Sequence, residues 1–377
     1  MKIGILTFHC ADNFGAVLQC YSLRKCLCSY KKIDAEVINY CPKHMTDRYR
    51  NFHSSKEIFS KIKDKGFFYT WKNMILVAIK TYKDRVSKKR KFDLFRNKYI
   101  EIKKTKYRKA SEIKEKYDIV IVGSDQVWNP VSNREDTAYY LDFVHAPTKK
   151  VSYAASVGIT DISKYKDDMM KYLSKFDKIS VREKSAISTL QTIIDKDIDV
   201  VVDPVFLTNR EEWDKLVDNM KLFEQPFIFL YCFNKDDKAV ELVNALSKKY
   251  DLPIIHFYYG GLRNKLYKDG KCYYFEGPLE FLWYIKNAQY VVTNSFHCAA
   301  FSVIFEKEVF CYLFKDRGSR TVDLLNSLGL EQRLCADKTT NDIIDNYKEI
   351  DYKEVNDRLS KLKNDSFRYI EDILKLC

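Results

Sequence analysis

Residues 118–129 read DIVIVGSDQVWN, an apolar run followed at once by a polar loop. The apolar residues from Ile119 to Val122 do not alternate with polar ones, which is typical of a strand buried on both faces of a parallel sheet. Gly123 permits a sharp turn or a close approach of the backbone to a ligand. Because ligands of open α/β sheets bind beyond the carboxyl ends of the strands, residues 123–129 are expected to form one wall of a binding site.

Apolar runs of the same kind occur on both sides of this stretch. In the first half they alternate with polar loops and helix-like segments, and they lie at residues 3–8, 35–40, 151–156, 179–182 and 200–202. A second series follows Pro226, with apolar runs at 227–233, 253–258 and 290–293 and helix-like segments at 238–250 and 279–287. This order predicts an α/β fold of two Rossmann-like halves, which share a pattern but no sequence repeat.

The length of the chain also favours two domains, because 377 residues exceed the size at which one hydrophobic core usually stops growing. The first series of runs ends at Asp203-Pro204 and the apolar residues that follow. We therefore place an N-terminal α/β domain at 1–207 and a C-terminal α/β domain at 208–349. Residues 350–377 carry an apolar stripe at helical spacing and are expected to form a helix that packs back on the body.

Basic residues are concentrated in one segment of the N-terminal domain. Residues 51–109 hold 19 Lys and Arg against five Asp and Glu, while the whole chain has a net charge of +13. Apolar residues recur in this segment at three- to four-residue steps, which predicts an insertion of basic amphipathic helices. A solvated insertion is the favoured interpretation. The alternative is a face that meets anionic lipid head groups or an acidic glycan, and no motif indicates nucleic acid.

Neither an export signal nor a membrane span is expected. The N-terminal apolar run is too short for a signal peptide, and the run at 74–79 has six residues where a membrane-spanning helix needs about 20. The 11 cysteines include no C-x-x-C pair, so neither a disulfide framework nor a metal site is indicated. The expected location is the cytoplasm, with peripheral contact at the inner face of the membrane through 51–109 as the lipid alternative.

Polar residues gather at four predicted strand ends, at 9–15, 123–129, 180–183 and 293–297. Ser295 is expected to be the N-cap of a helix, with His297 in its first turn. There the helix N-terminus favours bound anions and a neutral imidazole, which can donate or accept a hydrogen bond. An ordinary histidine on a capped helix would show the same pattern.

Three arginines could clamp a phosphate or carboxylate through paired N–H groups, or could form surface ion pairs instead. Arg182 lies at a strand end, and Arg317 and Arg320 lie in a loop after an apolar run. At 123–129, an aromatic residue stands beside amide and carboxylate groups, which is typical of a sugar site. A Walker A loop, a G-x-G-x-x-G loop and a G-x-S-x-G turn are all absent, so P-loop and serine-hydrolase chemistry is not indicated.

Six ordered blocks of sequence resemble the polysaccharide pyruvyl transferase family. They are LTFH (6–9) with NFGAVLQ (13–19), VGSDQVWN (122–129), SYAAS (152–156), SVRE (180–183), DPVFL (203–207) and TNSFH (293–297). The resemblance covers nearly the whole chain and implies a fold similar to the two-domain glycosyltransferases of the GT-B type. It also implies transfer of the enolpyruvyl unit of phosphoenolpyruvate onto two hydroxyls of a sugar, which forms a cyclic ketal and releases phosphate.

The resemblance and the chemistry of this reaction assign roles to individual residues. His297 and Asp125 are expected to be catalytic. Residues expected on the donor side are Asn294, Ser295, Arg182, Arg317 and Arg320. Residues expected on the acceptor side are His9, Asn13, Ser124, Gln126, Trp128 and Asn129. Phosphoenolpyruvate is a co-substrate here, and no metal or organic cofactor is expected.

One position departs from the family pattern. Many members carry an Arg two positions before the His, where this chain has Ser295. Either Arg320 or Arg317 reaches in to supply the cation, or this branch uses a different donor. The sugar, its attachment to a lipid and the oligomeric state are left open.

Two other functions remain as alternatives. A glycosyltransferase of the same architecture would bind a nucleotide-sugar between the domains, with Glu306 or Glu308 on the ribose. A protein without catalytic activity would bind anionic glycans or membrane through 51–109. The second alternative leaves the clustered polar residues at the strand ends without a role.

Overall fold

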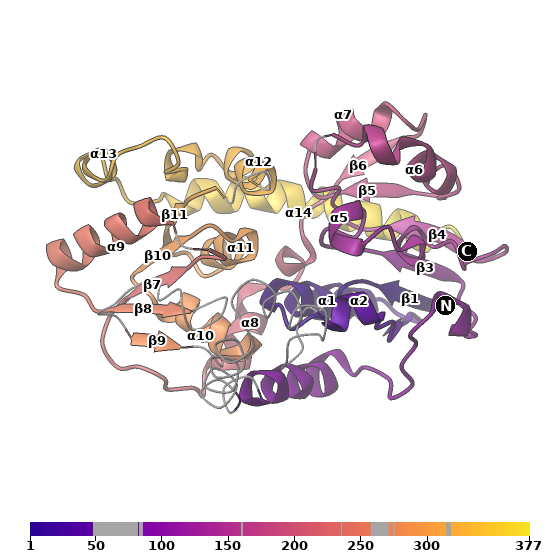
Figure 1. Ribbon diagram of the computed structural model, residues 1–377, viewed down its shortest axis with the longest axis horizontal. Coiled ribbons are helices and arrows are strands. Elements are labelled where there is room, and N and C mark those ends of the chain that lie inside the picture. Colours follow the sequence, from indigo (N-terminus) through magenta and orange to yellow (C-terminus); the bar gives the residue numbers. More distant parts are fainter. Residues whose placement is uncertain are drawn as a thin grey trace, which may run out of the picture.

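The computed structural model describes residues 1–47, 82, 86–159, 161–234, 236–257, 271–273, 276–313 and 318–377. Two α/β halves lie side by side, each built on a parallel sheet (Figure 1). In the view of Figure 1 the N-terminal half lies on the right and the C-terminal half on the left. The predicted two-fold repetition of an α/β architecture is confirmed.

The N-terminal half alternates strands and helices. Its strands are β1 (Lys2–Leu6), β2 (Asp34–Val37), β3 (Ile119–Val122), β4 (Lys149–Ser152), β5 (Ile179–Val181) and β6 (Ile198–Val200). Its α-helices are α1 (Phe14–Cys28), α2 (Lys43–Asp47), the helical residues 86–95, α5 (Pro130–Asn133), α6 (Lys166–Leu173) and α7 (Ser185–Gln191). Shorter helical turns are η1 (Arg96–Ile100), η2 (Ala110–Glu112), η3 (Thr137–Tyr140), η4 (Ser163–Tyr165) and η5 (Pro204–Phe206).

The C-terminal half repeats this alternation. Its strands are β7 (Ile228–Tyr231), β8 (Ile254–Phe257), β9 (Lys271–Tyr273), β10 (Tyr290–Thr293) and β11 (Glu308–Cys311). Its helices are α8 (Arg210–Val217), α9 (Asp237–Tyr250), α10 (Pro278–Asn287), α11 (Phe296–Ile304), α12 (Ser319–Leu328), η7 (Glu331–Arg333), α13 (Thr340–Asp345) and α14 (Tyr352–Leu374).

All strand pairs in the two sheets are parallel. The N-terminal strands follow the order β2-β1-β3-β4, and the bridges Val151↔Lys178 and Ala155↔Val181 attach the β5-β6 pair to β4. The C-terminal order is β11-β10-β7-β8-β9. Each half therefore has one edge at which the carboxyl ends of its strands meet. The polar loops that follow β1, β3, β5, β6 and β10 lie at these edges.

The central strands form because their side chains are apolar on both faces. All residues of β3 and of β10 are buried, and helices cover both faces of the sheets. An unalternated run buries apolar area on each side of the strand, which an amphipathic strand cannot do. The predicted runs agree with the strands to within about two residues, apart from longer overestimates at β2 and β4.

The two halves share a continuous hydrophobic core. Phe14 at the start of α1 stacks on Phe281 of α10, with 4.5 Å between ring centres. Trp213 of α8 packs its ring edge-on against Phe301 of α11 at 5.0 Å and against Tyr21 of α1 at 5.4 Å. These contacts hold α1 against α10 directly and against α11 through Trp213, which brings the two halves together at the site described below.

The last helix crosses from one half to the other. α14 begins beside the C-terminal half and ends on the N-terminal sheet, as its yellow ribbon shows (Figure 1). Near its end, Tyr369 donates a hydrogen bond to the Ser152 carbonyl at 2.7 Å, and Ser366 accepts one from the Val202 amide at 2.9 Å. α14 thus covers the N-terminal half although it follows the C-terminal half in sequence.

The described part of the basic segment packs on the body rather than standing in solvent. Phe92 and Phe95 are buried, and Lys91 forms ion pairs with Glu276 at 2.6 Å and Glu280 at 2.7 Å. Burial raises the pKa of Glu276, and the ion pair with Lys91 offsets only part of that effect. This corrects the expectation of a solvated insertion for residues 86–100. The predicted helices at 51–81 lie outside the described residues.

Candidate active site

Asp203, just after β6, is the centre of a charged cluster at the interface of the two halves. Its side chain is fully buried, and Oδ2 accepts hydrogen bonds from Arg182 Nη1 at 2.6 Å and Ser124 Oγ at 3.1 Å. His297 Nε2 of the C-terminal half lies 3.5 Å from the same oxygen. Burial alone would raise the pKa of Asp203, but His297 and Arg182 hold it well below its usual range. The carboxylate therefore remains ionised at neutral pH.

Arg182 is buried in this cluster, and two of its three guanidinium nitrogens, Nε and Nη2, make no hydrogen bond to the described residues. Its Nε lies 3.6 Å from Glu183, and its guanidinium lies 4.4 Å from the centre of the Phe296 ring. Nη2 is buried and has no hydrogen-bond partner among the described residues. Burial disfavours the charged guanidinium, yet Asp203, Glu183 and Asp125 together raise the pKa of Arg182. A permanent positive charge with a spare donor is suited to an anionic ligand.

His297 lies at the N-terminus of α11, as the sequence predicts. Ser295 is the N-cap and its side chain accepts from the Cys298 amide at 3.4 Å, which confirms the predicted cap. The imidazole packs against Gly15 of α1, where an added Cβ would lie 2.0 Å from Nδ1. The starts of α1 and α11 therefore meet directly, and only a glycine leaves room for the ring.

Asp125 and Arg320 face each other across the same interface. Asp125 has a positive φ of 74° and its Oδ1 accepts from the Gln126 amide at 2.9 Å. Arg320, in the first turn of α12, places Nη1 3.8 Å from that oxygen. Each side chain is about one-sixth exposed or less, so the pair is reachable from solvent but partly shielded. A carboxylate and a guanidinium at this separation attract each other without a direct hydrogen bond.

A cavity of about 240 Å³ adjoins the cluster. Arg182, Asp203, Phe296 and Arg320 form one end of it, and Leu359 and Leu362 of α14 contribute to the apolar remainder. The cavity is large enough for a small phosphorylated acid. Two of the three predicted arginines thus line one space, whereas Arg317 lies outside the described residues.

Two predicted acceptor residues, Trp128 and Asn129, are buried and bonded within the protein. Trp128 is fully buried, donates its indole N–H to the Tyr139 carbonyl at 3.2 Å and packs edge-on against Phe176. Asn129 is buried as the N-cap of α5. The expectation that Trp128 faces a sugar is therefore corrected. Its ring points into the hydrophobic core, which supplies both apolar contact and a hydrogen-bond acceptor.

His9 is also buried, and its ring is bonded within the protein. Its two ring nitrogens lie 3.1 Å from the Thr7 carbonyl and 3.2 Å from Asn39 Oδ1. Arg96 donates to the His9 carbonyl at 2.8 Å and to Asp12 at 2.6 Å, which holds the loop between β1 and α1 in place. His9 therefore supports this loop, and its predicted acceptor contact is not supported by this structure.

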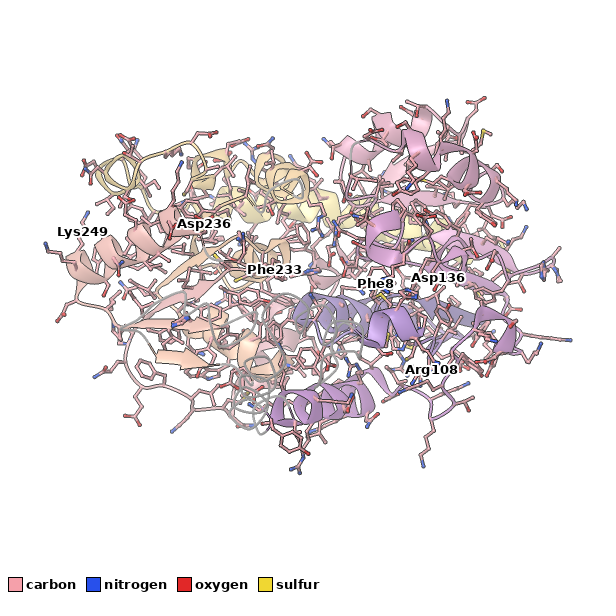
Figure 2. All side chains as sticks on the ribbon, viewed as in Figure 1. Phe8, Arg108, Asp136, Phe233, Asp236 and Lys249 are labelled. Carbon is pink, nitrogen blue, oxygen red and sulfur yellow. The ribbon has the colours of Figure 1, made fainter. Side chains whose placement is uncertain are left out.

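The remaining predicted residues are divided between caps and the interface. Asn13 is the N-cap of α1, and Ser124 is buried with its hydroxyl on Asp203 and on the Ala154 carbonyl. Gln126 is nearly buried, with Oε1 accepting from Ser132 at 3.3 Å and no partner on Nε2 among the described residues. Asn294 accepts from the Phe233 amide at 2.9 Å, and Figure 2 shows Phe233 on the side of the C-terminal half that faces the N-terminal half.

Two interface residues are absent from the predicted site. Asp203 follows an apolar run and precedes Pro204, so it lies at a strand end, as the predicted site residues do. That position could have identified it. Gly15 could not be found in the same way, because its role depends on the close approach of His297 from the other half of the chain.

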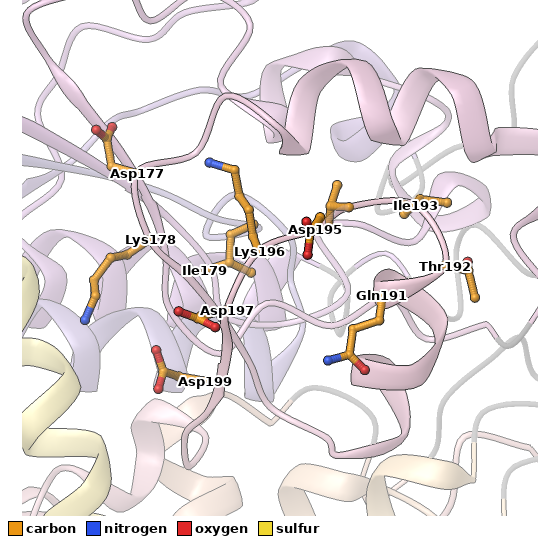
Figure 3. Close-up of a pocket in the computed structure, with 11 residues that line it drawn as sticks. Asp177, Lys178, Ile179, Gln191, Thr192, Ile193, Asp195, Lys196, Asp197 and Asp199 are labelled. Atoms are coloured by element: carbon orange, nitrogen blue, oxygen red, sulfur yellow. The ribbon is translucent and has the colours of Figure 1, made fainter.

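A larger cavity, of about 940 Å³, lies elsewhere in the N-terminal half (Figure 3). It is lined by Asp177, Asp195, Asp197 and Asp199 together with Lys178 and Lys196. Asp177 and Asp197 precede β5 and β6, so the cavity adjoins the amino ends of these strands, opposite the edge that carries the site. Among the described residues, no group of three or more His, Cys, Asp or Glu is placed to hold a metal ion.

The fold resembles solved sugar-nucleotide enzymes at low sequence identity. An S. aureus MnaA structure with UDP is 14% identical, with a TM-score of 0.53 over 100% of this chain and 97% of that one. A putative UDP-N-acetylglucosamine 2-epimerase from Listeria monocytogenes is 11% identical, with a TM-score of 0.53 over 98% and 94% of the two chains. A comparison with curated proteins found no match.

Two parallel α/β halves with a charged site between them define a protein of the GT-B type, as predicted. The family model for polysaccharide pyruvyl transferase matches residues 13–313, which is most of the chain. The chain belongs to this family of transferases. In the parts of the chain that the structure covers, no helix has the length and apolar character needed to span a bilayer.

Proposed function

We propose that the protein transfers the enolpyruvyl unit of phosphoenolpyruvate onto two hydroxyls of a glycan sugar. The observation that carries the proposal is the convergence of Arg182 and Arg320, from the two halves of the chain, on one cavity. His297 lies beside it, 3.5 Å from Asp203, and Asp125 lies 3.8 Å from Arg320. Phosphoenolpyruvate carries both a phosphate and a carboxylate, and paired arginines suit both groups. Membership of the family supports the same reaction.

The donor end of the site would rest on the arginines. Arg182 has its unused Nη2 for the donor, and Arg320 lines the same cavity. Many family members carry an arginine where this chain has Ser295, and Arg320 is placed to supply that charge. Both guanidiniums lie over the Phe296 ring, at 4.4 Å and 5.8 Å from its centre, which limits their movement.

His297 is proposed as the general acid. Protonation of the methylene carbon of phosphoenolpyruvate makes C2 electrophilic, so that a sugar hydroxyl can add to it. Asp203 Oδ2 lies 3.5 Å from Nε2 of the ring, and the close contact with Gly15 restricts the plane of the ring. Addition of the second hydroxyl expels phosphate and closes the ketal. Two hydroxyl protons are released, while the new methyl group and the phosphate each take up one.

Asp125 is proposed as the base for the sugar hydroxyls. It lies on the N-terminal side of the interface, and its side chain is partly open to solvent. Arrival of the donor anion at Arg320 would weaken the attraction between Arg320 and Asp125, leaving the carboxylate available to accept a proton. Ser124 and Gln126 flank this position, although both are largely buried.

The glycosyltransferase alternative receives less support. Glu308 starts β11 at the amino end of the strand and accepts from the Ile350 amide at 2.8 Å, while Arg333 lies 2.7 Å away. Glu306 is engaged by Arg210 and by Asn356. Neither carboxylate lies at the carboxyl end of a strand, where a ribose would bind.

The test is release of phosphate from phosphoenolpyruvate in the presence of a panel of glycan acceptors, free and lipid-linked. We expect release only with a suitable acceptor, whose mass should increase by one pyruvate less one water. The added group should be labile to acid, as a ketal is. Consumption of a nucleotide-sugar, with phosphoenolpyruvate left intact across the panel, would favour the glycosyltransferase instead.

A further inference from the structure

Asp203 joins more parts of the site than any of the residues predicted from sequence. Its oxygen Oδ2 meets Ser124 from the loop after β3, Arg182 from the end of β5 and His297 from the start of α11. Its other oxygen, Oδ1, accepts from the Val205 amide at 3.1 Å, which fixes the plane of the carboxylate. One rigid anion therefore contacts both halves of the molecule.

We propose that Asp203 is the positioning residue of the donor site, a built-in anion that orients Arg182 and His297 across the domain interface before the donor binds. The identification of the donor as phosphoenolpyruvate rests on the proposed function. The arrangement of the cations around Asp203 does not, because it is a matter of geometry alone.

The orientation of Arg182 follows from two contacts. Asp203 holds Nη1 at 2.6 Å, and the guanidinium lies over the ring of Phe296, the neighbour of His297. Nε and Nη2 both lack a hydrogen-bond partner among the described residues, but Nε lies 3.6 Å from Glu183, so Nη2 is the donor left for a ligand. Loss of Asp203 would free the guanidinium to turn, and the spare donor would no longer have a fixed direction.

The orientation of His297 depends on the same carboxylate. Its ring is wedged against Gly15 on the Nδ1 side, and Asp203 is the charged group that lies opposite Nε2, at 3.5 Å. Asp203 therefore links the acid of the C-terminal half to the arginine of the N-terminal half.

The charge of Asp203 has the opposite effect on the binding of an anion. A buried carboxylate attracts the two cations but repels a phosphate brought to the same place. Replacement of Asp203 by Asn keeps the shape and removes this repulsion. A positioning role thus predicts tighter binding of anions together with slower turnover, whereas a purely structural role predicts that both decline.

The test compares Asp203→Asn with Asp199→Asn, a matched control that makes the same chemical change on β6, at the remote cavity. Binding of inorganic phosphate and of phosphoenolpyruvate is measured by calorimetry, and kcat by phosphate release. We expect Asp203→Asn to bind both anions about fivefold more tightly, the scale of one unit charge near 4 Å in water. Its kcat should fall about 100-fold, as for a misplaced catalytic group, while the control matches the wild type.

Should Asp203→Asn fail to fold, Asp203→Glu serves instead, because it keeps the charge and moves the oxygens by one methylene. It should bind phosphate within about threefold of the wild type and still lose turnover, since charge is retained but geometry is not. Weaker anion binding in Asp203→Asn, or full turnover in either variant, would overturn the proposal. So would a wild type that binds neither anion.

The two levels of proposal can fail separately. If phosphate binding responds to Asp203→Asn as expected but no acceptor yields turnover of phosphoenolpyruvate, the proposed reaction fails and the role of Asp203 at an anion site stands. If turnover occurs and neither Asp203 variant changes it, the reaction stands and the role of Asp203 fails.

Discussion

His297 occupies the space that a side chain on residue 15 would fill. This contact between the two halves gives a direct test of the proposed acid. In Gly15→Ala the new Cβ would lie 2.0 Å from Nδ1, so the ring must move. A displacement of about 1 Å at a reacting group can cost about 100-fold in rate, and we expect a loss of kcat on this scale.

The control for this variant is Gly4→Ala in β1. Its added carbon would also be crowded, with Ile38 at 2.9 Å and Tyr117 at 3.1 Å, but it lies in the core away from the site. Both variants should lose stability in urea, by about 1–3 kcal/mol for overpacking. Only Gly15→Ala should lose kcat beyond what its stability explains. Equal kcat in the two variants would contradict the placement of His297.

The proposed acid and base can also be removed directly. We expect His297→Ala and Asp125→Asn each to lower kcat by at least about 100-fold, the usual contribution of a general acid or base. His145→Ala and Asp161→Asn make comparable changes at exposed positions and should leave kcat unchanged. Steady-state phosphate release checks this, and a rate near that of the wild type in either site variant removes that residue from the mechanism.

Sequence reasoning at this scale succeeded where a role depends on local structure. Ser295 as N-cap and His297 in the first turn follow from the chain around them. The predicted position of Trp128 in a sugar pocket was wrong, because a polar loop does not reveal which way a side chain points. The indole is buried in the hydrophobic core. The contacts of His297 with Gly15 and with Asp203 could not be predicted, since they join residues far apart in sequence.

At the scale of elements, the strands were the most predictable part. β3 and β10 are almost entirely apolar runs, so their composition predicts burial on both faces of the sheet. The prediction ran too far at β4, where the expected strand continued to Ser156 but the ladder ends at Ser152. Ala154 has a positive φ of 51° there, which breaks the strand geometry. This turn could not be predicted, because alanine rarely adopts a positive φ.

The docking of α14 can be tested through a single hydroxyl. Tyr369→Phe removes the buried hydrogen bond to the Ser152 carbonyl and leaves the ring in place. The free energy of unfolding should fall by about 1 kcal/mol, the usual net worth of one hydrogen bond. Urea denaturation measures it, with the half-buried Tyr165→Phe as control. An unchanged midpoint would mean that α14 does not depend on this contact.

For the whole molecule, Lys88 makes stability depend on pH. Its ammonium lies 5.1 Å from the centre of the Phe14 ring, at the shared core of the two halves. Burial lowers the pKa of Lys88 to about 8, with partial opposition from Asp12. Between pH 8 and the ordinary lysine value, the unfolded chain binds more protons than the folded one. The free energy of unfolding should therefore rise with pH in that window.

The measurement is the difference between variant and wild type across pH 7–10, because tyrosines also titrate near the upper end. Lys88→Met removes the cost of burying a charge, so it should be more stable than the wild type at pH 7, and this advantage should shrink toward pH 10. Lys89→Met, at an exposed neighbouring position, should show neither effect. A constant difference for Lys88→Met would show that Lys88 carries no buried charge.

The arrangement of the halves was predictable from sequence, but the contacts between them were not. Apolar runs, helix-like segments and family blocks indicated two α/β halves of GT-B type, as found. The part of the basic segment at 86–100 was read as a surface feature because of its charge. Phe92, Phe95 and Arg96 of this segment are instead buried against the rest of the chain. Such burial depends on a complementary surface that exists only once the chain has folded, so it could not be predicted from the segment itself.

The path of α14 decides how this protein could be recombined with its relatives. Ser366 and Tyr369 of this helix form hydrogen bonds with the N-terminal half, although they follow the C-terminal half in sequence. In a hybrid that exchanges only the first half of the chain, the N-terminal sheet would come from a relative, while α14 would still have the side chains that fit the original sheet. An exchange of the first half between family members should therefore move two separate coding segments together, the first half and the helix α14 that packs on it.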